Sequence, residues 1–276
     1  VSRGRSHHPF CIAPTAMPGS YLILDIGNSA VKWGQFAASG TLTDTGRLAL
    51  SPSQADAEAW RAALHVDAVR KADRVGIVSV VPKATQHAQT AIQAQCARPA
   101  TVLRVEGPLP FAMRYDTPHT LGTDRLAAAA AAWHEHGLPD PQSILAIDAG
   151  TALTIEVIDD EPAYRGGIIA PGPRLMRDAL STGGAQLPAV DLTAPPHPIG
   201  TTTEHALQSG IVHGFEAMAV GLVERLSRSL PHAPRVALTG GAAPLIHDAL
   251  PHVDTHDPHL VLRGTYQLLR HRAQYA

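Results

Sequence analysis

The sequence predicts an α/β protein built from two duplicated domains around a central cleft, and two internal repeats are the main observation. Residues 22–29 read Leu-Ile-Leu-Asp-Ile-Gly-Asn-Ser, and residues 145–152 read Leu-Ala-Ile-Asp-Ala-Gly-Thr-Ala, which aligns their aspartates. Later in each half, residues 74–80 (Arg-Val-Gly-Ile-Val-Ser-Val) match residues 235–241 (Arg-Val-Ala-Leu-Thr-Gly-Gly). One match is expected by chance, whereas two in the same order indicate duplication. The length of 276 residues suits one large or two small domains.

The first half reads as strands alternating with helices. Apolar runs that end at polar turns or at proline predict the strands, and alanines recurring on one face predict the first helix. In chain order we expect a strand at 21–25, a turn at 26–29, a strand at 30–36, a helix at 54–70, a strand at 74–81, a helix from 82 to about 96 and a strand at 101–105.

The second half begins with a loop that enters an alanine-dense helix ending near Gly137. Turn-forming residues then alternate with apolar runs. We expect a helix at 126–136, strands at 143–148 and 153–158, a turn-rich segment at 165–173, a helix to about 181, a Pro/Gly/Thr segment at 183–203, a strand from 235, and helices at 204–229 and 265–272. The expected units are a flexible extension at 1–20, an N-terminal domain at 21–118 and a C-terminal domain at 119–276.

Composition limits the class of partner. Hydrophobic residues make up 45% of the chain and the formal net charge is −2, so neither nucleic acid nor a membrane surface is an expected partner. No apolar run approaches the ~20 residues of a membrane span. Cys11 and Cys96 lie far apart and form no disulfide framework, which favours a cytoplasmic location. The clusters among the sixteen histidines lack helical metal-ligand spacing and are expected to be solvated.

The first repeat offers the groups that phosphate binding requires. Asp25 ends a buried strand, Ser29 supplies a hydroxyl in the turn, and Lys32 lies on the next strand. A carboxylate can hold a cation, turn amides can approach a phosphate, and an ammonium can neutralise a phosphoryl group. A plain β-hairpin turn explains this segment equally well when it is taken alone.

The second repeat, residues 148–152, favours the phosphate interpretation. Two such turns on a duplicated fold can face each other and clamp one polyphosphate, as in the superfamily of actin, the heat-shock chaperone ATPase and the sugar kinases. A Gly-x-x-x-x-Gly-Lys-Ser/Thr loop is absent from the sequence, which argues against a P-loop enzyme.

A third segment, Gly122-Thr-Asp-Arg125, opens the alanine-dense helix. Asp124 is explained by helix capping and Arg125 by a surface charge. The alternative is a site for a small acid, in which the guanidinium binds the acid and the aspartate takes a proton.

Taken together, the motifs resemble the type III pantothenate kinase family from about residue 21 to about residue 264. The matching motifs, in order, are Asp25-x-Gly-Asn-Ser-x-x-Lys32, Tyr115-x-x-Pro-x-x-Leu-Gly-x-Asp-Arg125, Asp148-x-Gly-Thr-Ala152, Gly166-Gly-x-Ile-x-Pro-Gly172, Thr203-Glu-x-Ala-x-x-Ser-Gly210 and Thr239-Gly-Gly241. The N-terminal extension is not part of the family pattern. The resemblance implies two RNase H-like domains of the actin-like ATPase type.

The resemblance also implies roles for individual residues. Asp124 would be the general base, Asp148 would bind a monovalent cation (potassium or ammonium), and Thr239 to Gly241 would lie near the nucleoside. ATP would be bound by Asp25, Ile26, Gly27, Asn28, Ser29, Ala30, Val31, Lys32 and Thr151. Pantothenate would be bound by Tyr115, Gly122, Thr123, Asp124, Arg125 and Thr203, with Thr123 at a variable position of its motif.

By the same resemblance, the protein would use ATP with Mg²⁺ to phosphorylate pantothenate, the first step of coenzyme A biosynthesis, and would act as a homodimer with its substrate site at the subunit interface. Two alternatives stay open. One is another kinase or phosphatase of the superfamily, such as a sugar kinase. The other is a non-catalytic transcriptional accessory factor on the same fold.

Overall fold

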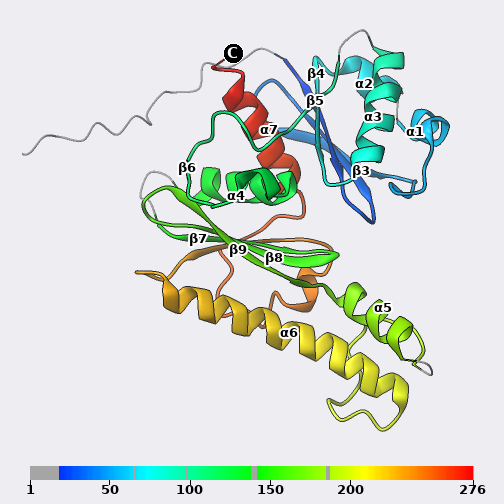
Figure 1. Ribbon diagram of the computed structural model, residues 1–276, viewed down its shortest axis with the longest axis vertical. Helices are drawn as coiled ribbons and strands as arrows, with labels where there is room; N and C mark the ends of the chain where they lie inside the picture. Colours follow the sequence, from blue (N-terminus) through cyan, green and yellow to red (C-terminus); the bar gives the residue numbers. More distant parts are fainter. Residues whose placement is uncertain (1–18, 65, 97–98, 138–141, 185–186, 276) are drawn as a thin grey trace, which may run out of the picture.

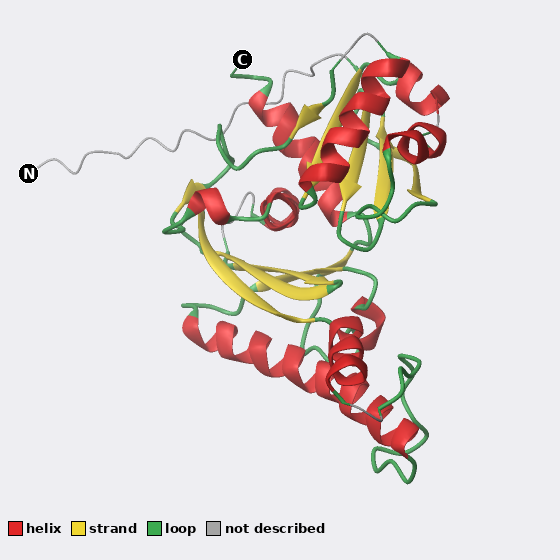
Figure 2. Ribbon diagram, turned by 45° about the vertical axis from the view of Figure 1, so that its right-hand side comes forward, coloured by secondary structure: helices red, strands yellow, loops and turns green. Residues whose placement is uncertain are grey.

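The computed structural model describes residues 19–64, 66–96, 99–137, 142–184 and 187–275. The expected extension at residues 1–20 therefore lies almost entirely outside the described residues. The described chain forms two β-sheets with helices on both sides of each (Figure 1). Figure 2 shows the two sheets as separate layers, with helices lying between them.

The first sheet has the strand order β3-β2-β1-β4-β5. The first three strands form an antiparallel meander, and the last two pair in parallel. The strands are β1 (Tyr21–Ile26), β2 (Val31–Phe36), β3 (Leu42–Leu48), β4 (Arg74–Ser79) and β5 (Thr101–Val102).

The second sheet repeats this topology. Its order is β11-β10-β7-β8-β9-β6, again an antiparallel meander joined to parallel strands, with β6 added at one edge. The strands are β6 (Ala112–Met113), β7 (Ile144–Ala149), β8 (Ala152–Ile158), β9 (Ala163–Pro171), β10 (Arg235–Thr239) and β11 (Thr255–His256). The predicted duplication is confirmed, because β1 and β7 hold equivalent central positions.

The helices form three layers around the sheets. The outer face of the first sheet is covered by α1 (Ala57–Ala63), α2 (Val66–Lys71) and α3 (Pro82–Gln95). The outer face of the second sheet is covered by α6 (Thr203–Ser229), and α5 (Pro173–Gly183) packs beside α6. Between the sheets lie α4 (Thr123–His136) and α7 (Leu260–Arg272), as Figure 1 shows.

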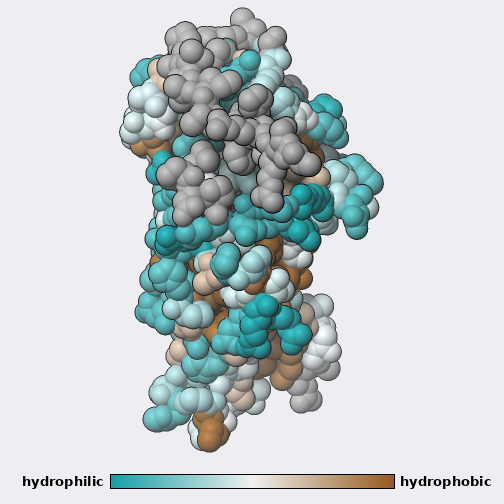
Figure 3. Space-filling model, turned by 90° about the vertical axis from the view of Figure 1, so that its left-hand side faces the viewer, coloured by the Kyte–Doolittle hydropathy of each residue, from teal (hydrophilic) through white to brown (hydrophobic). Residues whose placement is uncertain are grey.

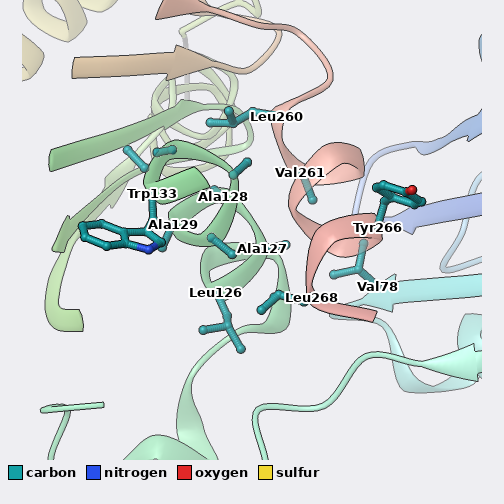
Figure 4. Packing of buried hydrophobic residues seen from close by; sticks show 14 of the residues in the cluster. Val78, Leu126, Ala127, Ala128, Ala129, Trp133, Leu260, Val261, Tyr266 and Leu268 are labelled. Carbon is teal, nitrogen blue, oxygen red and sulfur yellow. The ribbon is translucent and has the colours of Figure 1, made fainter. Parts of the chain in front are cut away.

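Helices α4 and α7 pack closely because the residues at their contact have small side chains or none. The six alanines at residues 127–132 are all buried. Figure 4 shows three of them, Ala127, Ala128 and Ala129. Gly264 of α7 lies against α4, and a Cβ atom there would fall 1.7 Å from the carbonyl oxygen of Ala127. On its other side α7 meets the first sheet, where the ring of Tyr266 stacks on that of Phe36 with centroids 4.5 Å apart. A single core therefore joins both sheets.

Several predicted elements differ from the structure. The turn-rich segment expected at 165–173 is mostly strand β9, because its glycines sit within a sheet ladder. The helix expected at 54–70 is two helices, since α1 ends at Ala63 and the next residue, Leu64, has an extended backbone. The segment after β10 contains a 3₁₀ turn, Ala243–Leu245, and α7 begins five residues earlier than expected. Strand β3 was not anticipated.

The expected domain boundary after residue 118 stays a prediction. Strand β6 precedes that boundary yet pairs with the second sheet, and α7 at the end of the chain packs on the first sheet. The two sheets therefore exchange elements across the predicted boundary.

Helix α6 is long and apolar enough to cross a membrane by length and composition alone, with a mean hydropathy of 1.3 over its best window. The expectation of no such run is therefore too strict. Phe215, Ala219 and Val223 of this helix are buried against the second sheet, as in the core helix of a globular protein. Figure 3 shows hydrophobic surface in the lower half of the molecule, where the second sheet and α6 lie.

Candidate active site

Two aspartates occupy equivalent positions near the ends of the two central strands. Asp25 is opposite Lys32 in the β1–β2 ladder, and Asp148 is opposite Thr154 in the β7–β8 ladder. The charge of Asp25 is felt by Asp148, and both aspartates interact with Lys32 and Asp124. The structure therefore brings together four of the residues predicted for the site.

Burial controls the protonation of these carboxyl groups. It raises the pKa of Asp25 to about 7 and that of Asp148 to about 6, and in both cases Lys32 works against the shift. One ammonium group does not balance two partly buried carboxylates and a third nearby. The site is therefore poised to take up a further cation.

The two predicted phosphate turns touch each other. The hydroxyl oxygens of Ser29 and Thr151 are 2.9 Å apart, although the two residues are 122 positions apart in the chain. The backbone N–H of Gly27 donates to the carbonyl of Ala30, and that of Gly150 donates to the carbonyl of Ala152. Each turn is therefore a tight loop, and the duplicated fold sets the loops face to face.

A cavity of about 250 Å³ opens beside Lys32. It is lined by Lys32, Thr45, Gly46, Arg47, Gly240, Gly241, Pro258 and His259. The lining carries two permanent cations and no carboxylate, which suits an anionic ligand. Gly240 and Gly241 were expected near a nucleoside, and they do line this cavity.

Arg47 and His259 were missed by the sequence analysis. Arg47 is opposite Lys32 in the β2–β3 ladder, so the two cationic side chains project from the same face of the sheet. His259 precedes α7, and the charge of Lys32 lowers its pKa in addition to a larger effect of burial. Only the register of β3 places Arg47 here, and β3 carries no motif.

The predicted substrate segment opens α4. Burial raises the pKa of Asp124, although its Oδ1 accepts the backbone N–H of Arg125 at 2.8 Å. Gly122 precedes the helix, and a Cβ there would lie 2.5 Å from the Oδ1 of Asp124. The hydroxyl of Thr123 donates to the carbonyl of Ser79 at 3.2 Å, which gives this side chain a structural contact.

Arg125 is buried and already paired. Its Nε and Nη2 donate to the two carboxylate oxygens of Glu156 at 2.7 and 2.8 Å. Tyr164 donates its hydroxyl to the same carboxylate, and the ring of Tyr115 meets that of Tyr164 edge to face. The sequence analysis missed Glu156 and Tyr164, because neither belongs to a motif that it used.

Thr203 stands apart from the other predicted substrate residues. It is exposed at the start of α6, and α6 covers the face of the second sheet opposite to α4 (Figure 1). Within one chain, the structure does not bring Thr203 next to Asp124 or Arg125.

The described residues hold no group of three or more His, Cys, Asp or Glu side chains arranged to bind a metal ion. A Mg²⁺ ion that arrives with a polyphosphate needs only one or two protein carboxylates, because phosphate and water oxygens complete its shell. Asp25 and Asp148 fit that requirement. Burial raises the pKa of both carboxyl groups, and Lys32 compensates only in part, so a bound cation would stabilise their charged forms.

Comparisons with solved structures place the fold. The chain superposes on a ROK family glucokinase from Streptomyces griseus with a TM-score of 0.53 and 14% identity, covering 91% of this chain and 99% of that one. It superposes on (R)-2-hydroxyglutaryl-CoA dehydratase component A from Acidaminococcus fermentans with a TM-score of 0.51 and 13% identity, covering 93% and 97%. At these identities the likeness concerns the fold alone, and it confirms the expected actin-like ATPase architecture.

Comparisons of sequence place the family. The chain is 35% identical over 249 residues to the type III pantothenate kinase of Acidothermus cellulolyticus, covering 88% of this chain and 95% of that protein. It is 32% identical over 256 residues to the type III pantothenate kinase of Chlorobaculum parvum, covering 90% and 94%. A family model described as type III pantothenate kinase matches residues 21–225. With its duplicated fold and its motifs in order, the chain belongs to the type III pantothenate kinase family.

Proposed function

We propose that this protein transfers the γ-phosphoryl group of ATP to the primary hydroxyl of pantothenate, the first step of coenzyme A biosynthesis. Family membership supports the reaction. The structural observation that carries the proposal is the proximity of Asp124 to both phosphate turns, because three partly buried carboxyl groups and Lys32 interact electrostatically between the sheets. The segment at residues 122–125, proposed to bind the acceptor, therefore lies close to the two turns proposed to bind the nucleotide.

The nucleotide half of the site is assigned to the cavity beside Lys32. The polyphosphate lies along the turns at residues 25–32 and 148–152, and the nucleoside extends toward Gly240 and Gly241. Lys32 and Arg47 face the polyphosphate as permanent cations. Bound Mg²⁺ neutralises phosphate charge in such transfers, and Asp25 and Asp148 are the residues that would hold it.

The acceptor half is assigned to the start of α4. Asp124 accepts the proton of the pantothenate hydroxyl while the hydroxyl oxygen attacks the γ-phosphorus, and ADP leaves with the electrons of the broken P–O bond. Burial raises the pKa of Asp124, which makes it a stronger base than a solvated aspartate. Arg125 and Tyr115 bind the pantothenate carboxylate end.

A monovalent cation, potassium or ammonium, is proposed at Asp148. Support comes from its buried carboxyl group, whose pKa is raised to about 6 and which therefore gains from a nearby positive charge. The proposed location is the cytoplasm, in keeping with the wide separation of the two cysteines.

The active unit is proposed to be a homodimer. Large apolar side chains are exposed at one end of the second sheet: Ile169 at 64%, Leu175 at 42%, Leu180 at 41% and Ile199 at 84%. They lie on β9, on α5 and in the loop before α6, and Ile199 is four residues before Thr203. Association through this region would cover them and would bring Thr203 of one subunit to the acceptor site of the other.

The decisive experiment measures ADP release by the purified protein with ATP and Mg²⁺, using pantothenate or a panel of sugars as acceptor. We expect release with pantothenate alone, and faster release in K⁺ or NH₄⁺ than in Na⁺ salts. ADP release only with a sugar would show that the protein is another kinase of the superfamily. Absence of release with every acceptor would favour the non-catalytic alternative. Equal rates in the three salts would remove the cation from the proposal.

A further inference from the structure

A carboxylate that no proposed step uses lies at the centre of the acceptor site. Glu156 of β8 is 0% exposed, and its two oxygens accept the Nε and Nη2 of Arg125 at 2.7 and 2.8 Å. The hydroxyl of Tyr164 donates to the same carboxylate at 2.5 Å. Three donors from two elements therefore converge on one buried side chain.

The strands around Glu156 are shaped to hold this arrangement. The β8–β9 register slips after Val157, and Gly166 at the slip has a φ of 103°, a backbone conformation that favours glycine. A Cβ atom on Gly166 would lie 3.0 Å from the ring of Tyr115. The bulge thereby lets Tyr115 approach β9, where its ring meets that of Tyr164 with centroids 5.9 Å apart.

The bidentate contact determines what Arg125 can offer a ligand. A guanidinium group has five N–H donors in one plane, and two parallel bonds to a carboxylate fix that plane. Glu156 occupies the Nε–Nη2 edge, so the donors of Nη1 remain on the other side of the group. The Tyr115 side chain lies close enough to Arg125 to help raise the pKa of the guanidinium group, as Glu156 does more strongly.

Stability alone is a weak explanation for this pair. Moving an arginine and a glutamate out of water costs as much as their attraction returns in many proteins, and well-packed apolar side chains do equally well. A fixed guanidinium plane, in contrast, is valuable where a ligand carboxylate must be met by two aligned donors.

We propose that Glu156 is a positioning residue for the acceptor substrate: by clamping one edge of Arg125, with Tyr164 as a third contact, it aims the remaining N–H donors at the substrate carboxylate. This proposal rests on the proposed function, in which Arg125 binds the carboxylate end of pantothenate. Glu156 acts through Arg125 and touches neither substrate.

The test compares the KM values for the two substrates in the full-length protein. Glu156→Gln keeps the shape of the side chain but replaces one carboxylate oxygen with an NH₂ group. That group is a donor and cannot accept a hydrogen bond from Arg125. We expect the KM for pantothenate to rise about 10- to 100-fold, as for loss of a charge-assisted hydrogen bond, with the KM for ATP changed less than about 2-fold. Tyr164→Phe, which removes only one of the three contacts, should raise the pantothenate KM about 2- to 10-fold.

A double-mutant cycle separates positioning from general damage. Arg125→Lys keeps the charge but loses the planar fork, and should itself raise the KM for pantothenate. If Glu156 acts through Arg125, adding Glu156→Gln to Arg125→Lys changes that KM less than about 2-fold further. The matched control is Glu161→Gln, which breaks the exposed ion pair with Arg114 (3.1 Å) and should leave both KM values unchanged.

Several outcomes would overturn the proposal. These are an unchanged pantothenate KM in Glu156→Gln, an equal rise in both KM values, full additivity in the cycle, or an unaffected Arg125→Lys. If Glu156→Gln does not fold, as judged by urea denaturation, Tyr164→Phe decides on the same criteria. Failure of the proposed function is distinguishable, because the wild-type protein would then release no ADP with pantothenate.

Discussion

Asp124 combines two properties that a general base requires. It lies in the charge field of both phosphate turns, and burial raises its pKa above that of an exposed aspartate. Asp124→Asn should lower kcat by about 10²–10⁴-fold, because the amide accepts no proton, while both substrates still bind. Steady-state kinetics together with calorimetric binding of ATP and pantothenate would check this. A kcat near the wild-type value would move the base elsewhere.

The ionisation of Asp25, a residue of the candidate site, affects the free energy of unfolding. Its native pKa of about 7 is higher than in the unfolded chain, so between pH 4 and pH 7 the native state holds a proton that the unfolded state releases. The free energy of unfolding therefore falls as pH rises through this range. Asp25→Asn should stabilise the unliganded protein by about 2–4 kcal/mol at pH 8 and leave it unchanged near pH 4.

Urea denaturation of both proteins at the two pH values would measure the effect of Asp25→Asn. The control is Asp44→Asn in β3, whose side chain is exposed and which should leave stability unchanged at either pH. A variant less stable than the wild type at pH 8 would show that Asp25 contributes to folding instead of opposing it.

Arg47 gives the nucleotide half of the site its own test. It lines the cavity opposite Lys32, and a charge-assisted hydrogen bond to a phosphate contributes about 1.5–3 kcal/mol. Arg47→Gln should therefore raise the KM for ATP about 10- to 100-fold and leave the KM for pantothenate within about 2-fold. Arg61→Gln on the exposed side of α1 is the control. Equal effects on both KM values would argue against a nucleotide contact.

At the scale of elements, the contact between α4 and α7 depends on the absence of a side chain at Gly264. A Cβ there would fall 1.7 Å from the backbone oxygen of Ala127, so one helix must shift. Gly264→Ala should lower the free energy of unfolding by about 1–3 kcal/mol, measured by urea denaturation.

The matched control for that contact is Gly221→Ala in α6. No atom lies within 4 Å of the position that its Cβ would take, so only helix propensity changes and stability should rise by about 0.5–1 kcal/mol. If both alanine variants shift stability in the same direction, the close approach of α4 and α7 is not what constrains Gly264.

Elements differ in how much of them the sequence could predict. Strands β1 and β7 are mainly apolar runs, and each is followed by a turn of similar sequence. Hydrophobic pattern and internal repetition therefore both predict them. Strand β9 contains two glycines and a proline, and β3 contains only two leucines among polar residues and glycine. Their strand form depends on pairing with β8 and β2, which no local pattern encodes.

The candidate site divides in the same way. Asp25, Lys32 and Asp148 came from the repeated motif, and Asp124 and Arg125 from a motif at a helix start. Glu156 and His259 lie in segments without a motif. Their places follow from strand register and from helix packing over long sequence distances, and those are tertiary properties.

At the scale of the whole molecule, the separation of Thr203 from the acceptor site is the strongest argument for a shared site. Thr203→Val should raise the KM for pantothenate about 2- to 10-fold and spare ATP, as for one lost hydrogen bond. Thr201→Val, two residues earlier and also exposed, is the control.

Mixing two variants tells whether Thr203 acts in its own subunit or in the partner. In a heterodimer of Asp124→Asn with Thr203→Val, a shared design rebuilds one complete site, because one chain supplies Asp124 and the other supplies Thr203. We then expect activity with the wild-type KM for pantothenate after the subunits exchange. A mixture that shows only the KM of Thr203→Val, or light scattering that shows an active monomer, would exclude the shared site.

The position of α7 also has a consequence for how the first sheet is covered during synthesis. This helix spans residues 260–272, yet its Tyr266 stacks on Phe36 and meets Tyr21 edge to face, more than 200 residues earlier in the chain. The inner face of the first sheet thus stays uncovered until residues 260–272 have been made. We therefore expect a chain that stops short of residue 260 to expose an apolar sheet face that is prone to aggregation.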